Sequence, residues 1–199
     1  MVKYIMKKTF NQKFNKPMVE IFAGEYYTTN KSNLILSTLL GSCVAVCMVD
    51  QYNEVAGINH IMISKSADPK QMLLSQDSRY GIHAMELLIN NMLKKGANRR
   101  RLQAKVFGGG KVLNNNETDI AYANVDFAVS YLENEDVPIL ARDTGGHGGR
   151  KIYFFPKDFS VYLRRIEMKS YLEKTKVEEK KQFEKQHQDE KAGELTLFE

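Results

Sequence analysis

Two side chains of this sequence, those of Cys43 and His60, are the types that acyl transfer by a cysteine nucleophile requires. Cys43 lies in an apolar run at residues 39–46, and His60 lies in a second apolar run at residues 55–63. A thiol attacks a carbonyl as its thiolate, and with a reference pKa of about 8.5 a cysteine is only about 3% ionised at pH 7. A neighbouring imidazole can accept the thiol proton. The pair therefore predicts a nucleophile with a general base, if the fold brings the two side chains together.

The elements that must position this pair are two strands. Both apolar runs are short, rich in β-branched residues and bounded by turn-forming residues, which is typical of buried strands. Tyr52 and Asn53 lie between the runs and favour a turn. We therefore predict a hairpin that brings Cys43 close to His60.

The glycine before the cysteine suggests how the reaction could be stabilised. Gly41 can turn the chain sharply and leave backbone N–H groups pointing outward. The N–H groups of Cys43 and of Ser42 or Gly41 could then form an oxyanion hole for a carbonyl under attack. In the alternative interpretation, Cys43 and Cys47 are small buried hydrophobic residues of a core strand.

From about residue 20 to residue 165, an ordered set of motifs resembles the CheD family, the chemoreceptor glutamine deamidases of bacterial chemotaxis. These motifs are residues 23–26, residues 40–46, Gly57 with residues 60–62, residues 96–97 and 102–109, Asn124, and residues 143–146 with Gly149 and Arg150. The resemblance implies that Cys43 is the nucleophile and His60 its general base. A hydroxyl residue shortly before the cysteine completes the family's triad; Ser37 and Thr38 are both candidates, and we favour Thr38.

The same resemblance assigns the glycine-rich segment at residues 143–150 to the rim of the active site. Asp143, Gly145, Gly146 and Arg150 belong to this rim, whereas Gly41 and Ser42 form the active-site loop beside the nucleophile. Asp143 could hold Arg150 through a charge-assisted hydrogen bond, and a purely structural ion pair explains the two residues equally well.

The implied activity is hydrolysis of glutamine side chains of methyl-accepting chemoreceptors to glutamate through a cysteine thioester, which tunes chemotaxis. A methylesterase acting on receptor glutamyl methyl esters would use the same groups, as would a cysteine peptidase or a transglutaminase. A non-catalytic adaptor that binds receptors or a CheC-like phosphatase is a further alternative. The expected partners are the cytoplasmic domains of chemoreceptors and a CheC-like phosphatase of phosphorylated CheY.

Composition and motif spacing argue against binding of nucleic acid, nucleotides and metal ions. The net charge is +5, but the cluster Arg99-Arg100-Arg101 has no organised basic face around it, so we expect no nucleic-acid binding. The glycine-rich segments at residues 107–111 and 143–150 lack nucleotide-binding spacing, and the Cys and His residues match no zinc pattern, so we expect no cofactor and no metal.

The sequence also predicts where the protein resides. No apolar window approaches the length of a membrane-spanning helix, and two cysteines four residues apart suit a reducing compartment. We expect a cytoplasmic monomer without membrane insertion.

The remaining periodicity predicts the fold class. Apolar residues recur at helical spacing over residues 79–95 and 120–132, and β-rich runs cover residues 102–107 and 137–141 and a hairpin at residues 151–163. This mixed order favours an α/β (α+β) layered fold with a mixed or antiparallel sheet. The resemblance implies a β-sandwich flanked by helices, like papain-like and cytotoxic-necrotizing-factor-like deamidases. We place the domain at residues 18–167, followed at residues 168–199 by a charged extension that is partly helical or disordered.

Overall fold

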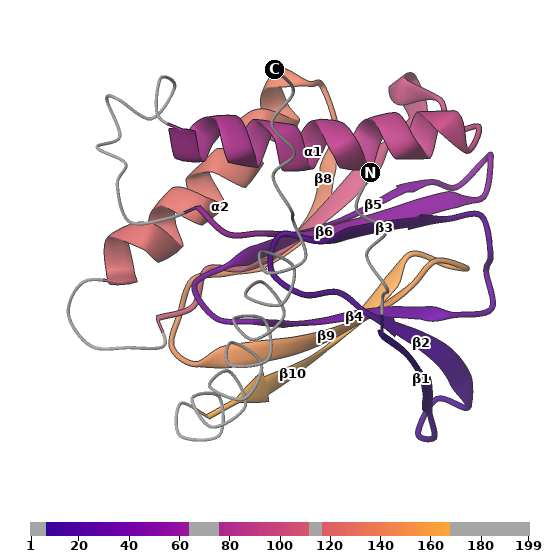
Figure 1. Cartoon of the computed structure of the whole chain (residues 1–199), viewed down its shortest axis with the longest axis horizontal. Helices are drawn as coiled ribbons and strands as arrows, with labels where there is room; N and C mark the ends of the chain where they lie inside the picture. Colours follow the sequence, from indigo (N-terminus) through magenta and orange to yellow (C-terminus); the bar gives the residue numbers. More distant parts are fainter. Residues whose placement is uncertain (1–6, 64–75, 112–116, 168–199) are drawn as a thin grey trace, which may run out of the picture.

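A computed structural model describes residues 7–63, 76–111 and 117–167, and in these ranges ten strands and two long helices form three layers (Figure 1). The strands of the N-terminal half are β1 (Lys7–Asn11), β2 (Lys16–Glu20), β3 (Tyr26–Thr29), β4 (Ile35–Leu40), β5 (Val44–Asp50) and β6 (Val55–Ile61). The C-terminal half contains α1 (Gln76–Lys94), the 3-10 turn η2 (Arg99–Arg101), β7 (Gln103–Gly108), α2 (Glu117–Asn134), β8 (Ile139–Thr144), β9 (Gly149–Phe155) and β10 (Ser160–Ile166).

The strands form two five-stranded sheets. The first sheet has the order β1-β2-β4-β9-β10, and the second has the order β3-β6-β5-β7-β8. The pairs β2–β4 and β7–β8 are parallel and the other neighbours are antiparallel, so both sheets are mixed. The predicted class, a layered α+β sandwich of mixed strands flanked by helices, is confirmed.

The second sheet lies in the middle of the molecule, between the helices and the first sheet (Figure 1). Successive side chains of β5 therefore point into two different cores. Val44, Val46 and Met48 pack toward α1 and α2, whereas Ala45 and Cys47 pack toward the first sheet. Because both faces of β5 are covered, the whole strand is buried and its sequence is continuously apolar.

The predicted hairpin is confirmed. β5 and β6 pair antiparallel across the turn at residues 51–54, with Val44 opposite Ile61 and Ala45 opposite His60. The prediction of one strand over residues 39–46 is wrong, because β4 ends at Leu40 and β5 begins at Val44. The intervening bend carries the chain from the first sheet to the second, so Cys43 lies in a connection between sheets.

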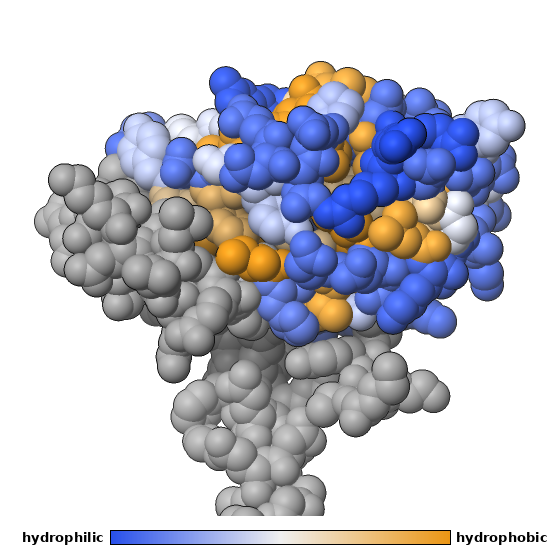
Figure 2. Space-filling view, turned by 90° about the horizontal axis from the view of Figure 1, so that it is seen from above, coloured by the Kyte–Doolittle hydropathy of each residue, from blue (hydrophilic) through white to orange (hydrophobic). Residues whose placement is uncertain are grey.

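The remaining elements mostly follow the predicted pattern. Met85, Leu88, Ile89 and Met92 are buried on α1, as the helical spacing over residues 79–95 predicts, whereas Ile82, which the same spacing places on that face, is exposed. β1 and the first residues of β2 precede residue 18, where we had placed the start of the domain. The predicted extension at residues 168–199 lies outside the described residues. Hydrophilic residues cover most of the helical face of the molecule (Figure 2).

Replacing Leu88 with alanine should destabilise the fold, because this buried residue joins α1 to the second sheet. We expect the free energy of unfolding to fall by about 2–5 kcal/mol. Ile82→Ala on the same helix is the matched control and should cost about 1 kcal/mol, clearly less than Leu88→Ala, because Ile82 is 37% exposed. Urea unfolding followed by circular dichroism measures both; similar losses in the two variants would contradict this packing.

Candidate active site

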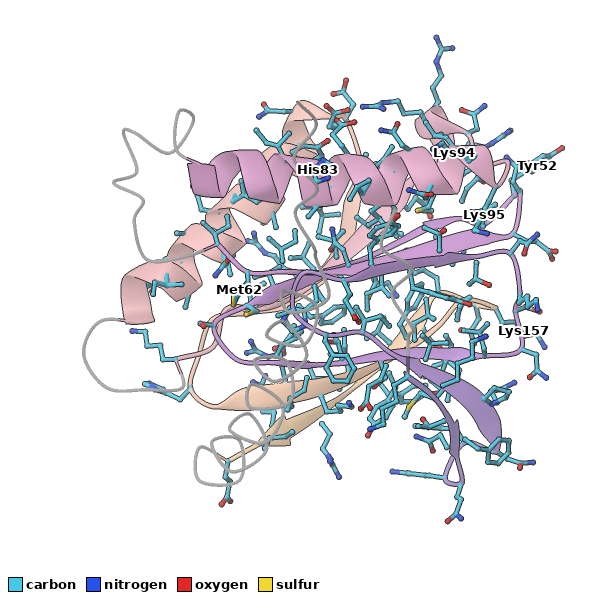
Figure 3. All side chains as sticks on the ribbon, viewed as in Figure 1. Tyr52, Met62, His83, Lys94, Lys95 and Lys157 are labelled. Atoms are coloured by element: carbon cyan, nitrogen blue, oxygen red, sulfur yellow. The ribbon has the colours of Figure 1, made fainter. Side chains whose placement is uncertain are left out.

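The candidate nucleophile lies in the connection between β4 and β5, at the end of the sandwich away from the β5–β6 turn. In Figure 3, Tyr52, in the turn, lies at the right edge of the molecule, and Met62, just after β6, lies on the opposite side of the sheet's centre. Cys43 is partly exposed, whereas Cys47 is buried, and burial raises the pKa of the Cys47 thiol. Of the two thiols, Cys43 is therefore the one that a substrate can reach.

Three hydrogen bonds fix the carbonyl groups of the connection at residues 41–43. The N–H of Gly110 donates to the carbonyl of Gly41 at 2.7 Å, and the N–H of Gly109 donates to the carbonyl of Cys43 at 2.8 Å. The side-chain amide of Asn124 donates to the carbonyl of Ser42 at 3.2 Å. The predicted active-site loop is thus held by the segment after β7 and by α2.

The glycines after β7 are required by the closeness of this contact. A Cβ atom on Gly108 would lie 2.1 Å from the carbonyl oxygen of Cys43, and the φ angle of Gly108 is +125°. A Cβ on Gly110 would lie 2.3 Å from the carbonyl oxygen of Gly148. A side chain at Gly108 would push this segment away from residues 41–43, and one at Gly110 would push it away from the loop that contains Gly148. The glycines of this segment therefore have a structural role.

Arg150 joins the two glycine-rich segments from inside the protein. Its guanidinium donates to the carbonyl of Gly108 at 2.5 Å and to that of Gly145 at 2.6 Å. The expected pair with Asp143 is present, with Arg150 Nε at 3.1 Å from Asp143 Oδ1, and Asp143 also pairs with Arg165 at 2.7 Å. Arg150 is only 1% exposed, so these contacts hold the loops that in turn hold residues 41–43.

Gly145 and Gly146, the other predicted rim residues, connect the same loops through their backbones. The N–H of Gly145 donates to the carbonyl of Gly108 at 3.0 Å. The carbonyl of Gly146 accepts from the N–H of Lys111 at 2.9 Å. The predicted rim therefore lies against the segment that supports Cys43.

His60 lies on β6 and faces the space between the two sheets. Ala45, its partner across the strand pair, packs in the core between the sheets, and Cys43 packs against the same core two residues earlier. Cys43 directly precedes β5 and packs against the same core as Ala45, so the candidate nucleophile and His60 lie on the same side of the second sheet.

Thr38 binds the ring of His60 from the opposite sheet. Thr38 Oγ1 lies 2.8 Å from His60 Nδ1 and donates its only proton to the carbonyl of Ile21 at 2.7 Å. The hydroxyl must therefore accept the hydrogen bond from Nδ1–H, because the carbonyl can only accept. The proton thus resides on Nδ1, and Nε2 carries the free lone pair. Within the described residues, Nε2 is buried without a hydrogen-bond partner.

Strand alternation separates the two hydroxyl candidates. Thr38 lies on the same face of β4 as Leu36 and Leu40, which pack between the sheets. Ser37 points to the other face, where its hydroxyl donates to the carbonyl of Ile152 at 2.8 Å. The structure thus brings Thr38, and not Ser37, to His60.

The environment of His60 favours its neutral form. The pKa of His60 is lowered from 6.5 to about 4, chiefly by burial and also by the charge of Lys151, while the carbonyl of Ile21 opposes the shift. At neutral pH the imidazole can therefore accept a proton. The backbone of His60 is also fixed, because its carbonyl accepts from the N–H of Gly24 and its N–H donates to the carbonyl of Glu25, both at 2.9 Å.

Two contributors to the site were not among the predicted site residues. Asn124 belongs to the motifs of the resemblance, but the sequence assigns it no role. Ile21 has no sequence signal for a role in the site, because it acts through its backbone carbonyl.

Among the described residues, no three His, Cys, Asp or Glu side chains gather closely enough to hold a metal ion. In the same part of the chain, no helix is both long and apolar enough to cross a membrane.

Comparisons with known proteins identify relatives of this chain. The family model described as CheD chemotactic sensory transduction matches residues 62–165. A protein of Shewanella oneidensis named probable chemoreceptor glutamine deamidase CheD 2 is 48% identical over 169 residues, covering 80% of this chain and 82% of the relative. A probable chemoreceptor glutamine deamidase CheD of Bordetella parapertussis is 44% identical over 161 residues, covering 80% and 75%. A Geobacter sulfurreducens relative, probable chemoreceptor glutamine deamidase CheD 1, is 42% identical over 162 residues, covering 78% and 80%.

The lowered pKa of His60 predicts a specific loss of stability in acid. Between pH 6.5 and about pH 4 the unfolded chain binds a proton at His60 and the folded chain does not, so acidification favours unfolding. The loss attributable to His60 should be on the order of 2–3 kcal/mol between pH 7 and pH 4.5. Urea unfolding at both pH values, compared between the wild type and His60→Gln, measures it. Equal losses in the two proteins would contradict a buried neutral imidazole.

Proposed function

The chain belongs to the CheD family, and on this premise we propose that it deamidates specific glutamine side chains in the cytoplasmic part of chemoreceptors. The observation that carries the proposal is the hydrogen bond from His60 Nδ1 to Thr38, because it leaves the lone pair of Nε2 on the face of the sheet that also holds Cys43. An acyl-transfer enzyme with a cysteine nucleophile needs this arrangement of base and thiol.

In the proposed first step, His60 Nε2 takes the thiol proton of Cys43 as sulfur attacks the carbon of the glutamine carboxamide. The carbonyl oxygen becomes an oxyanion, which backbone N–H groups of residues 41–43 stabilise. The imidazolium of His60 then gives its proton to the leaving nitrogen, the C–N bond breaks, and ammonia departs. A thioester between Cys43 and the receptor side chain remains.

In the second step, water attacks the thioester carbon while His60 Nε2 accepts a proton from it. Collapse of the second tetrahedral intermediate breaks the C–S bond, returns the thiol and leaves a glutamate on the receptor. The neutral ring of His60 has its Nε2 lone pair available to accept a proton in both steps, and each general acid–base contribution is worth about 10²–10⁴ in rate.

The chemical outcome defines the biological role that we propose. Each turnover replaces a neutral amide with a carboxylate and so changes the charge of the receptor surface, which would tune its signalling. A CheC-like phosphatase is the second partner that family membership suggests. The protein acts in the cytoplasm in this proposal, where the modified receptor segments lie.

The proposed reaction can be tested on a purified cytoplasmic fragment of a chemoreceptor. Peptide mass spectrometry should detect conversion of glutamine to glutamate by the wild type and none by Cys43→Ala, because the thioester cannot form without the thiol. A binding assay with both proteins is the control. Binding without conversion by the wild type would favour the non-catalytic adaptor and contradict the deamidase.

The role of Thr38 can be separated from that of its neighbour. Thr38→Val keeps the side-chain shape but removes the acceptor for His60 Nδ1–H, so kcat should fall about 10- to 100-fold. Ser37→Ala removes an equally buried hydrogen bond from the opposite face of β4. It should cost about 1 kcal/mol of stability and leave kcat within about twofold. Equal losses of kcat, measured at a temperature at which both variants are folded, would contradict the assigned role.

A further inference from the structure

Asn124 connects three parts of the candidate site through one side chain. It lies in the interior of α2 and is fully buried. Its Oδ1 accepts from the N–H of Ile63 at 2.7 Å, and its Nδ2 donates to the carbonyl of Ser42 at 3.2 Å. The amide therefore ties α2 both to the residue before Cys43 and to the chain three residues after His60. The carbonyl of Ser42 needs a donor and the N–H of Ile63 needs an acceptor, so only one orientation of the Asn124 amide satisfies both.

The bond to Ser42 also sets the direction of the next N–H group. The carbonyl of Ser42 and the N–H of Cys43 belong to one trans peptide and point in opposite directions. The N–H of Cys43 therefore points away from Asn124 and α2. In the preceding peptide, the carbonyl of Gly41 is bound by the N–H of Gly110, so the N–H of Ser42 is likewise directed away from that loop.

We infer that Asn124 is a positioning residue that holds the Ser42–Cys43 peptide with its N–H aimed at the oxyanion, an inference that rests on the proposed deamidation. The donated hydrogen bond also polarises this peptide, because hydrogen bonds in a chain strengthen one another. Loss of one oxyanion donor in an acyl-transfer enzyme costs about 10²–10³ in kcat. Asn124 thus acts on the transition state, although it lies behind the loop.

Substitution with aspartate separates this role from general support of the fold. Asn124→Asp keeps an acceptor for the N–H of Ile63 but replaces the amide donor with a carboxyl group. Once that group is ionised, at the alkaline end of a pH series, the carbonyl of Ser42 loses its donor and the peptide turns. The matched control is Asn91→Asp on α1, which also exchanges an amide donor for a carboxylate. Asn91 Nδ2 donates to the carbonyl of Leu87 at 2.8 Å and to the hydroxyl of Tyr26 at 3.2 Å.

Two reactions of Cys43 supply the readouts. Deamidation of the receptor fragment passes through an oxyanion, whereas alkylation by iodoacetamide forms the S–C bond as iodide leaves and develops no oxyanion. Alkylation therefore reports the thiol and its base alone. If Asn124 only supported the fold or the pairing of Cys43 with His60, its loss would slow both reactions together.

The experiment measures kcat and KM for deamidation and the rate of Cys43 alkylation, each across the pH series, in the wild type, Asn124→Asp and Asn91→Asp, with folding verified by circular dichroism. For Asn124→Asp at the alkaline end of the series we expect kcat to fall about 100-fold with KM nearly unchanged, and the alkylation rate and its pH profile to stay within about threefold. Asn91→Asp should keep kcat within about threefold. Unchanged kcat in Asn124→Asp at alkaline pH, or an equal loss in alkylation or in Asn91→Asp, would overturn the inference. A wild type that converts no receptor glutamine would instead overturn the proposed function, and this inference with it.

Discussion

The hydrogen bond between Thr38 and His60 is the constraint on which the site depends, because it is made between the two sheets. Thr38 belongs to β4 of one sheet and His60 to β6 of the other, and both side chains are buried in the apolar space between them. A polar pair in such a place must satisfy its own hydrogen bonds, since water cannot. Two hydrogen bonds do so, because His60 Nδ1–H donates to the hydroxyl of Thr38, which in turn donates to the carbonyl of Ile21. Of the polar atoms of this pair, His60 Nε2 alone has no hydrogen-bond partner among the described residues. The same hydrogen bond thus joins the two sheets and orients the imidazole of His60 as a base.

The nucleophile is held by a second set of contacts from behind. The connection at residues 41–43 crosses between the sheets, and its three carbonyl groups bind Gly110, Asn124 and Gly109. Arg150 fixes the glycine-rich segment that supplies two of these donors. Because Gly110 and Asn124 bind the carbonyl groups of Gly41 and Ser42, the N–H groups of Ser42 and Cys43, which belong to the same two peptides, point away from these donors. A partly exposed thiol is therefore combined with a rigid backbone, which is what transition-state stabilisation without reorganisation requires.

Much of this arrangement could be predicted from local sequence patterns. The β-branched runs around Tyr52 and Asn53 predicted the hairpin, with His60 on its second strand, and helical spacing predicted most of the buried face of α1. The division of residues 39–46 into strands of two different sheets could not be predicted, because both strands are apolar and buried and only Gly41 marks the bend. Alternation along β4 from Leu36 to Leu40 could have favoured Thr38 over Ser37 if the interior face had been known. The contact of Asn124 with Ser42, which lies 82 residues earlier, has no local signal.

Nitrogen NMR of the His60 ring, in protein labelled with ¹⁵N-histidine, tests this arrangement most directly. The four histidines can be distinguished by comparison with His60→Gln. Near pH 7 the His60 signals should be those of a neutral ring with the proton on Nδ1 and a bare Nε2, and Thr38→Val should relax this preference. A ring protonated on Nε2, or an imidazolium at pH 7, would contradict the assignment of His60 as a buried neutral base oriented by Thr38.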